Sequence, residues 1–235
     1  MKKIKIMAAA LLLFGATACN DNTDEPTYTP ANGDVAEIME ESLASSLGGM
    51  TEEMASLGGA LEAKNGEFEL ECGVPFDTTF VFMITGDVNG EFTRNWSLLL
   101  NCTDGENPFL DVHTSYVGSL VGPYRIRERE GARDWTWTQI GPVGDLRYMY
   151  GTGQHSGFRT FNANGATFSW DYDVEWTNVA VLKQANKVDS GSGVFTLSLT
   201  GPEGNTFIFN GTVVFNGDQS ATVTVNGEVY EVDLG

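Results

Sequence analysis

The sequence predicts a mainly β protein, an antiparallel meander (barrel or sandwich) with a short N-terminal helical segment. From Asn65 onward apolar and polar residues alternate in run after run, as in the stretch FTLSL at 195–199, which is typical of strands with one buried face. Short connections rich in glycine and asparagine separate these runs, and short connections force neighbouring strands to be antiparallel. Because a large open sheet leaves exposed edges, we expect the sheet to close on itself or to fold over.

The strongest local signals are Asn-Gly pairs with a strand pattern on either side. Asn226-Gly227 lies between two such patterns, and Asn89-Gly90 and Asn164-Gly165 repeat the signal earlier in the chain. A tight type I′ turn needs positive φ angles, which asparagine and glycine adopt at the lowest cost. The sequence therefore predicts a hairpin turn at each pair, within one β domain that covers residues 65–235.

A helical segment is predicted at residues 34–64. Asp34, followed three residues later by Glu37, is typical of a capping box at a helix start. A stripe of apolar residues at helical spacing predicts a face that packs on the domain: Val35, Ile38, Met39, Leu43 and Leu47. Gly48-Gly49 ends this helix, and Thr51 is placed to cap a second, shorter one.

Residues 1–18 have the composition of a secretory signal peptide. Three lysines precede a short apolar run, which ends in the small residues of Ala16-Thr17-Ala18-Cys19. These four residues resemble a bacterial lipobox, in which the cysteine is acylated on sulfur and becomes the mature N-terminus. The resemblance implies that acylated Cys19 anchors the chain in the lipid bilayer. The alternative is a soluble secreted protein that carries this cysteine by chance.

Residues 19–33 are polar, acidic and proline-containing, a composition that stays extended and solvated. We interpret them as a flexible tether behind the lipidated cysteine. Asp21, Asp24 and Glu25 resemble the surface-export signal of Bacteroidota lipoproteins, in which acidic residues follow that cysteine. The resemblance implies an outer-membrane lipoprotein exposed on the cell surface. A plain hydrophilic spacer on a periplasm-facing lipoprotein is the alternative.

The charge balance excludes one class of partner. The chain has 13 Lys and Arg against 32 Asp and Glu, and removal of the leader takes three of the lysines and no acid. Such acidity excludes nucleic acid, whose phosphates require a positive surface. It allows a cationic partner or weak Ca²⁺ binding, or it serves only to keep the surface solvated.

Two cysteines remain after Cys19, namely Cys72 and Cys102, and an even pair in an exported chain predicts a disulfide. Closing a loop of that size would stabilise the fold by roughly 3–4 kcal/mol in the chain-entropy model. A catalytic thiol is the alternative.

Two groups of side chains are possible ligand-binding residues. Arg125, Arg127 and Arg129 alternate along a predicted strand and therefore share a face, where they could hold a carboxylate or sulfate. Pairing with neighbouring acids such as Glu128 and Glu130 is the alternative. Trp135 and Trp137 also share a strand face, and such flat amphipathic rings can stack on sugars or can belong to the core.

The search for catalytic chemistry finds one weak candidate. Asp111 and His113 alternate on a predicted strand and would lie on one face, as a base and its orienting acid require. They define the alternative function, a hydrolase with its site near this pair. The second histidine, His155, lies in a glycine-rich stretch, residues 151–157, that we interpret as a turn. The residues indicate no metal site and no cofactor.

The lipobox, the helical segment, the two spaced cysteines and the hairpin-rich tail at 190–235 together resemble uncharacterised β-rich outer-membrane lipoproteins of Bacteroidota, of unknown function. No activity follows from that resemblance. The sequence as a whole predicts a membrane-anchored lipoprotein that acts as a non-enzymatic binding or structural envelope protein. Its expected partners are the bilayer through Cys19 and a glycan or another envelope protein.

Overall fold

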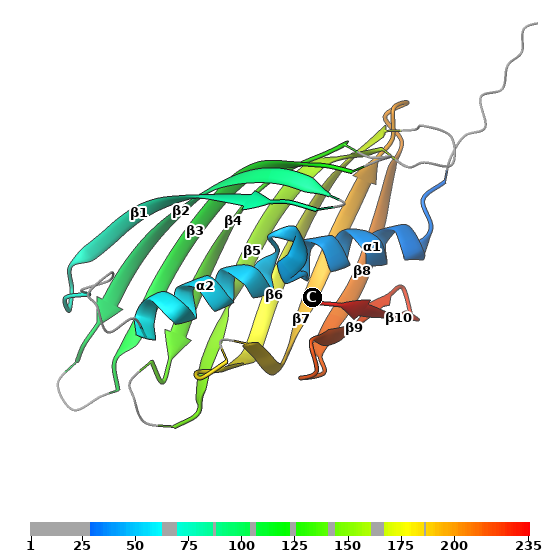
Figure 1. The fold of residues 1–235 in the computed structure, drawn as a ribbon. Helices are drawn as coiled ribbons and strands as arrows, with labels where there is room; N and C mark the ends of the chain where they lie inside the picture. Colours follow the sequence, from blue (N-terminus) through cyan, green and yellow to red (C-terminus); the bar gives the residue numbers. More distant parts are fainter. Residues whose placement is uncertain are drawn as a thin grey trace, which may run out of the picture.

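The computed structural model describes residues 29–62, 70–86, 88–103, 107–122, 126–140, 144–160, 167–185 and 187–235. They form one curved antiparallel sheet with two helices on its concave side (Figure 1). Ten strands follow one another in chain order, each hydrogen-bonded to its neighbours, so the predicted meander is confirmed. The expected closure is not found. The sheet is a single layer that does not close into a barrel, because the helices cover its concave face.

The elements have the following bounds. The N-terminal segment contains helix α1 Asn32–Leu43, a 3₁₀ turn Ser45–Leu47 and helix α2 Met50–Glu62. The strands are β1 Pro75–Ile84, β2 Asn89–Asn101, β3 Phe109–Val121, β4 Ile126–Thr138, β5 Leu146–Thr160, β6 Thr167–Leu182, β7 Lys187–Thr200, β8 Thr206–Phe215, β9 Ser220–Val225 and β10 Glu228–Asp233. Helix α1 contacts β9 and β10, and α2 contacts β7, so the two ends of the described chain lie together (Figure 1).

The capping box of α1 differs from the prediction in its register. The helix begins at Asn32, so Asp34 is its third residue, and the carboxylate of Asp34 accepts a hydrogen bond from the backbone N–H of Ala31 at 2.7 Å. Glu37 therefore has no capping role. Its carboxylate pairs instead with Arg159 of the sheet.

The other turn signals have mixed outcomes. Asn226-Gly227 joins β9 to β10 with both φ angles positive, as predicted. Helix α1 already ends at Leu43, so Gly48-Gly49 does not end it; Gly48, with a φ of 68°, ends the 3₁₀ turn that follows. Thr51 lies inside α2 and its hydroxyl donates to a backbone carbonyl at the end of α1, so it does not cap α2. Asn89-Gly90 begins β2 and does not form the turn itself. Asn164-Gly165 lies outside the described residues.

The core lies between the helices and the concave face of the sheet. The interior strands alternate between buried side chains on this face and more exposed side chains on the opposite face, which we call the outer face. Helix α1 contributes Ile38 and Met39, and α2 contributes Met54. They pack in one cluster with sheet residues that include Leu98, Leu110, Trp137, Val174, Leu197 and Val223.

Large rings on the concave face lie opposite glycines. Several rings have a glycine as their direct cross-strand partner, among them Phe92 with Gly118, His155 with Gly131, Trp170 with Gly157, Trp176 with Gly193 and Phe195 with Gly211. A Cβ atom at Gly118 would lie 2.1 Å from Cδ1 of Phe92, and one at Gly211 would lie 2.4 Å from Cζ of Phe195. These glycines therefore provide the space in which the rings lie against the backbone of the neighbouring strand.

The predicted disulfide is confirmed. Cys72 and Cys102 are bonded across 30 residues of sequence, with their Cα atoms 5.6 Å apart. Cys72 also forms an isolated bridge to Leu100 at the end of β2. The bond therefore fixes the chain that leads into β1 to the end of the neighbouring strand.

The pairing of rings with glycines gives a testable prediction for stability. We expect Gly118→Ala to lower the free energy of unfolding by about 1–3 kcal/mol, because the new methyl group overlaps the ring of Phe92. Gly33→Ala is the matched control, since a Cβ atom there meets Tyr230 at an ordinary 3.8 Å. Urea unfolding of both variants measures the difference. Equal stability of the two variants would contradict the packing argument.

Candidate functional site

The two tryptophans predicted as a possible sugar platform are core residues. Trp135 and Trp137 lie on the concave face of β4, where their exposed fractions are 4% and 0%. The ligand-binding prediction for them is wrong, because rings covered by two helices cannot stack on a sugar from solvent.

The predicted arginine face also points inward. Arg127 and Arg129 share the concave face of β4 with the tryptophans, and Arg125 lies outside the described residues. The guanidinium of Arg127 lies 2.8 Å from the Glu41 carboxylate of α1. That of Arg129 donates to the backbone carbonyls of Glu41 at 2.6 Å and of Leu47 at 2.5 Å. The predicted anion site is therefore wrong.

These two arginines are part of a larger set that joins the sheet to the helices. Arg94 of β2 contacts Glu52 at 2.6 Å and Glu53 at 3.7 Å. Arg133 of β4 pairs with Glu53, and Arg159 of β5 pairs with Glu37 and with Glu41. We call these contacts the arginine clamp: Arg94, Arg127, Arg129, Arg133 and Arg159 with Glu37 and Glu41 of α1 and Glu52 and Glu53 of α2. Breaking one partner of such a buried pair is strongly destabilising, since it leaves an uncompensated charge.

The predicted catalytic pair of Asp111 and His113 does not form, because His113 contacts a different acid. Nδ1 of His113 lies 2.7 Å from Oδ1 of Asp134 on β4. Asp111 instead accepts hydrogen bonds from Asn101 at 2.9 Å and from Thr136 at 2.9 Å, so it does not orient His113. The side chains of the His113–Asp134 pair are 55% and 74% exposed. A base without exclusion of water and without positioned oxyanion donors has little catalytic power.

The outer face carries a row of acids on each side of β5. Its strand neighbours β4 and β6 each present three exposed carboxylates there: Glu128, Glu130 and Asp134 on β4, and Asp171, Asp173 and Glu175 on β6. Between them β5 presents the side chains of Thr152, Gln154 and Ser156. We call this arrangement the β5 trough.

The surface along the β5 trough is hollowed over most of its length. Three hollows of about 800, 570 and 520 Å³ follow β5 in turn. Adjacent hollows share side chains from all three strands, first Glu130, Ser156 and Asp171 and then Ala132, Gln154 and Asp173. Exposed Phe158 and Val117 line the widest hollow at one end. From Thr152 to Phe158 the trough spans about 20 Å at the usual rise per strand residue.

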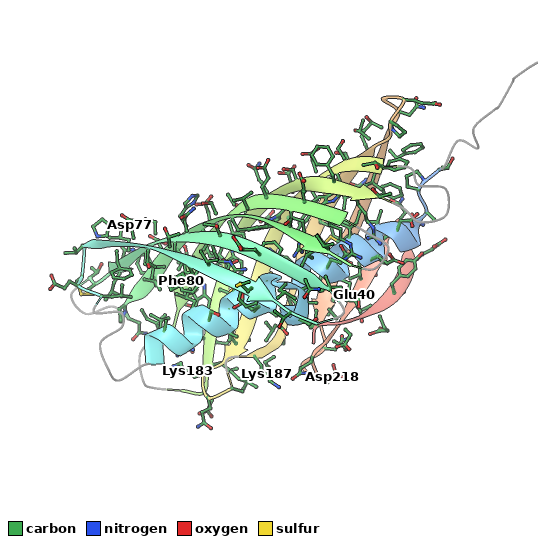
Figure 2. The ribbon with its side chains drawn as sticks, turned by 45° about the horizontal axis from the view of Figure 1, so that its top comes forward. Glu40, Asp77, Phe80, Lys183, Lys187 and Asp218 are labelled. Atoms are coloured by element: carbon green, nitrogen blue, oxygen red, sulfur yellow. A yellow bond between two sulfur atoms is a disulfide. The ribbon has the colours of Figure 1, made fainter. Side chains whose placement is uncertain are left out.

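The carboxylates of the trough lack cations around them. The arginines in the described part of the chain lie on the concave side, most of them in the clamp, and Lys183 is 7% exposed. The one exposed lysine or arginine among the described residues is Lys187, at the start of β7 and at one end of the sheet (Figure 2). Within the trough Gln154 donates to Asp173 at 2.9 Å and Ser156 donates to Glu130 at 3.2 Å. These are neutral donors. At the end of the trough Asp134 contacts His113, so among the described residues no lysine or arginine neutralises the trough.

His155 is the centre of a buried polar cluster beneath the trough. It lies in strand β5, so the interpretation of residues 151–157 as a turn is wrong. Its Nδ1 lies 2.9 Å from the hydroxyl of Tyr116, and its ring packs on that of Tyr172 with centroids 4.5 Å apart. Burial, and then the positive charges of Arg133 and Arg129, hold the pKa of His155 well below its usual 6.5. The imidazole is therefore neutral in the folded protein.

The neutral His155 predicts a pH dependence of stability. The unfolded chain takes up a proton at this imidazole below pH 6.5 and the folded chain does not, so acid favours unfolding. We expect the free energy of unfolding to fall by up to about 1.4 kcal/mol per pH unit below that value from this group. Urea unfolding between neutral and mildly acidic pH should show that His155→Gln lacks this component.

Thr152→Ser is the matched control, because it changes an exposed residue of the same strand that does not titrate and should leave the slope unchanged. Equal slopes for the His155 variant and the wild-type chain would show that His155 is protonated in the folded state.

Comparison with known proteins assigns no family to this arrangement. The sequence matches no family model, and no curated protein and no solved structure is significantly similar to it. Within the described ranges, no helix is long and apolar enough to cross a membrane. The same part of the chain contains no group of three or more His, Cys, Asp or Glu side chains placed to hold a metal ion. Any function must therefore be argued from the surface geometry.

Proposed function

We propose that this chain is an exported lipoprotein, anchored through Cys19, whose β domain binds an extended cationic ligand in the β5 trough. The observation that carries the binding proposal is the separation of charge across the sheet. The described arginines face the helices, whereas six carboxylates line a hollowed surface on the opposite side. A ligand with several positive charges is the chemistry that complements this surface.

The shape of the trough favours an extended peptide with basic side chains. Carboxylates on β6 recur at alternate residues, and alternate residues of an extended chain are separated by about 7 Å. Lysine or arginine at every second position of a bound peptide would therefore meet successive acids. Phe158 and Val117 at the wide end offer an apolar contact for one uncharged side chain.

The proposed lipid anchor and the proposed cell-surface location are supported by the sequence at the start of the chain. Cys19, Asp21, Asp24 and Glu25 lie outside the described residues, and their resemblance to a lipobox and an export signal supports the proposal. An outward-facing lipoprotein would meet basic peptides from the surrounding medium. The domain itself supports binding over catalysis, since the His113–Asp134 pair is open to solvent.

The trough can be tested with a lysine-rich peptide as the probe. We expect the triple variant Glu130→Gln, Asp171→Asn, Asp173→Asn to bind octalysine at least about tenfold more weakly than the wild-type chain, since each contact contributes on the order of 1 kcal/mol or less. Titration calorimetry at low and high salt measures this. Binding to the wild-type chain should weaken with salt, because exposed charges are screened.

The matched control changes three acids away from the trough: Asp77→Asn, Asp145→Asn and Glu203→Gln. It alters net charge by the same amount, so a specific trough predicts nearly wild-type affinity for it. Equal losses in both triple variants would show that octalysine responds only to overall charge, and would remove the trough from the proposal.

Anchoring is tested separately at the cysteine. We expect the wild-type chain to incorporate fatty acid and to fractionate with the outer membrane, and Cys19→Ser to do neither, because several acyl chains are needed for stable attachment. Digestion of the wild-type chain by protease added to intact cells would support surface exposure. Protection until lysis would support a periplasm-facing protein instead.

A further inference from the structure

The two edges of the sheet are unequal. Strand β10 is short, carries three acids in six residues and lies against α1. Strand β1 is ten residues long and carries Asp77 as its one charged side chain. Among the described strands β1 pairs with β2 alone. Charges on an edge strand oppose pairing with another chain, so β10 is protected in a way that β1 is not.

The β1 edge is apolar on both faces. On the outer face Val81 is 63% exposed and Met83 is 66% exposed. On the concave face Phe80 is 37% exposed, with its ring packed edge-on against Trp96 at 4.7 Å between centroids. Figure 2 labels Asp77 and Phe80 along this border of the sheet. An unprotected apolar strand of this length is a template for one more strand.

We propose that the β1 edge pairs with the β1 edge of a second copy of this chain, in antiparallel orientation about a two-fold axis at Phe80. The axis is perpendicular to the sheet, so residues that face each other must belong to the same face. Centring the axis on Phe80 pairs Phe76 through Ile84 and leaves out Pro75, which has no N–H to donate. Asp77 then faces Met83 of the other copy, and no two like charges meet.

The distribution of acids is compatible with this dimer. The carboxylates of the β5 trough begin on β4, and the two β4 strands would be seven strand spacings apart along the joined sheet, about 33 Å. That distance is several times the Debye length of about 8 Å at physiological salt. The strongly negative chains therefore repel each other weakly at an edge that is almost free of charge.

The oligomeric state of the purified chain, with its disulfide formed, tests the proposal. Sedimentation across micromolar concentrations should show a dimer for the wild-type chain. Val81→Lys should weaken the dimer at least about tenfold, because a charge on the edge opposes pairing. Ile208→Lys is the matched control: Ile208 is 64% exposed on the outer face of β8, an interior strand, and this variant should remain dimeric.

A cross-link tests the register independently of these substitutions. Facing residues of antiparallel strands have Cα atoms about 4.5–5.5 Å apart, so Phe80→Cys should form a disulfide between copies. Val194→Cys, 62% exposed on β7, should not. A monomeric wild-type chain would overturn the proposal, and so would equal weakening by both lysine variants. A dimer without the Phe80→Cys cross-link would overturn the register and hence the assigned axis.

Discussion

The arginine clamp is the interaction on which the rest of this structure depends. An open sheet of ten strands has a concave apolar face that must be removed from water, and here two short helices cover it. Apolar packing alone would leave their orientation weakly defined. A glutamate of α1 or α2 forms an ion pair with each of four arginines: Arg94, Arg127, Arg133 and Arg159. The fifth, Arg129, donates to backbone carbonyls of the same helical segment. These contacts fix where each helix lies along the strands.

The clamp also determines the character of the opposite face. A chain with few basic residues uses five of its six described arginines to hold its helices. The outer face is left with carboxylates that no described lysine or arginine neutralises, and the short side chains of β5 make a hollow between two rows of them. The packing of the helices and the negative charge of the outer face thus have one origin, the inward orientation of the arginines.

Much of the architecture is readable in the sequence, because alternation, the Asn226-Gly227 turn and the paired cysteines are local signals. Which of the two faces of a strand is buried is not a local signal, because it depends on what the whole sheet packs against. Arg127, Arg129, Trp135 and Trp137 share one parity on β4, so they must be buried or exposed together. That shared parity was the available signal for a buried arginine face, since tryptophans favour the core. The trough was beyond prediction, since it requires the pairing of β4, β5 and β6.

The chain order of the meander has a consequence for how the protein folds. Every strand pairs with its neighbour in sequence, so hairpins can form one after another from local contacts. The helices differ, since Glu37 meets Arg159 across 122 residues and Asn32 meets Asn226 across 194. The helical segment is therefore synthesised before the strands and can dock fully only after the last strands have been synthesised. Between those events the concave face is open, and the final docking of α1 and α2 is the step that closes folding.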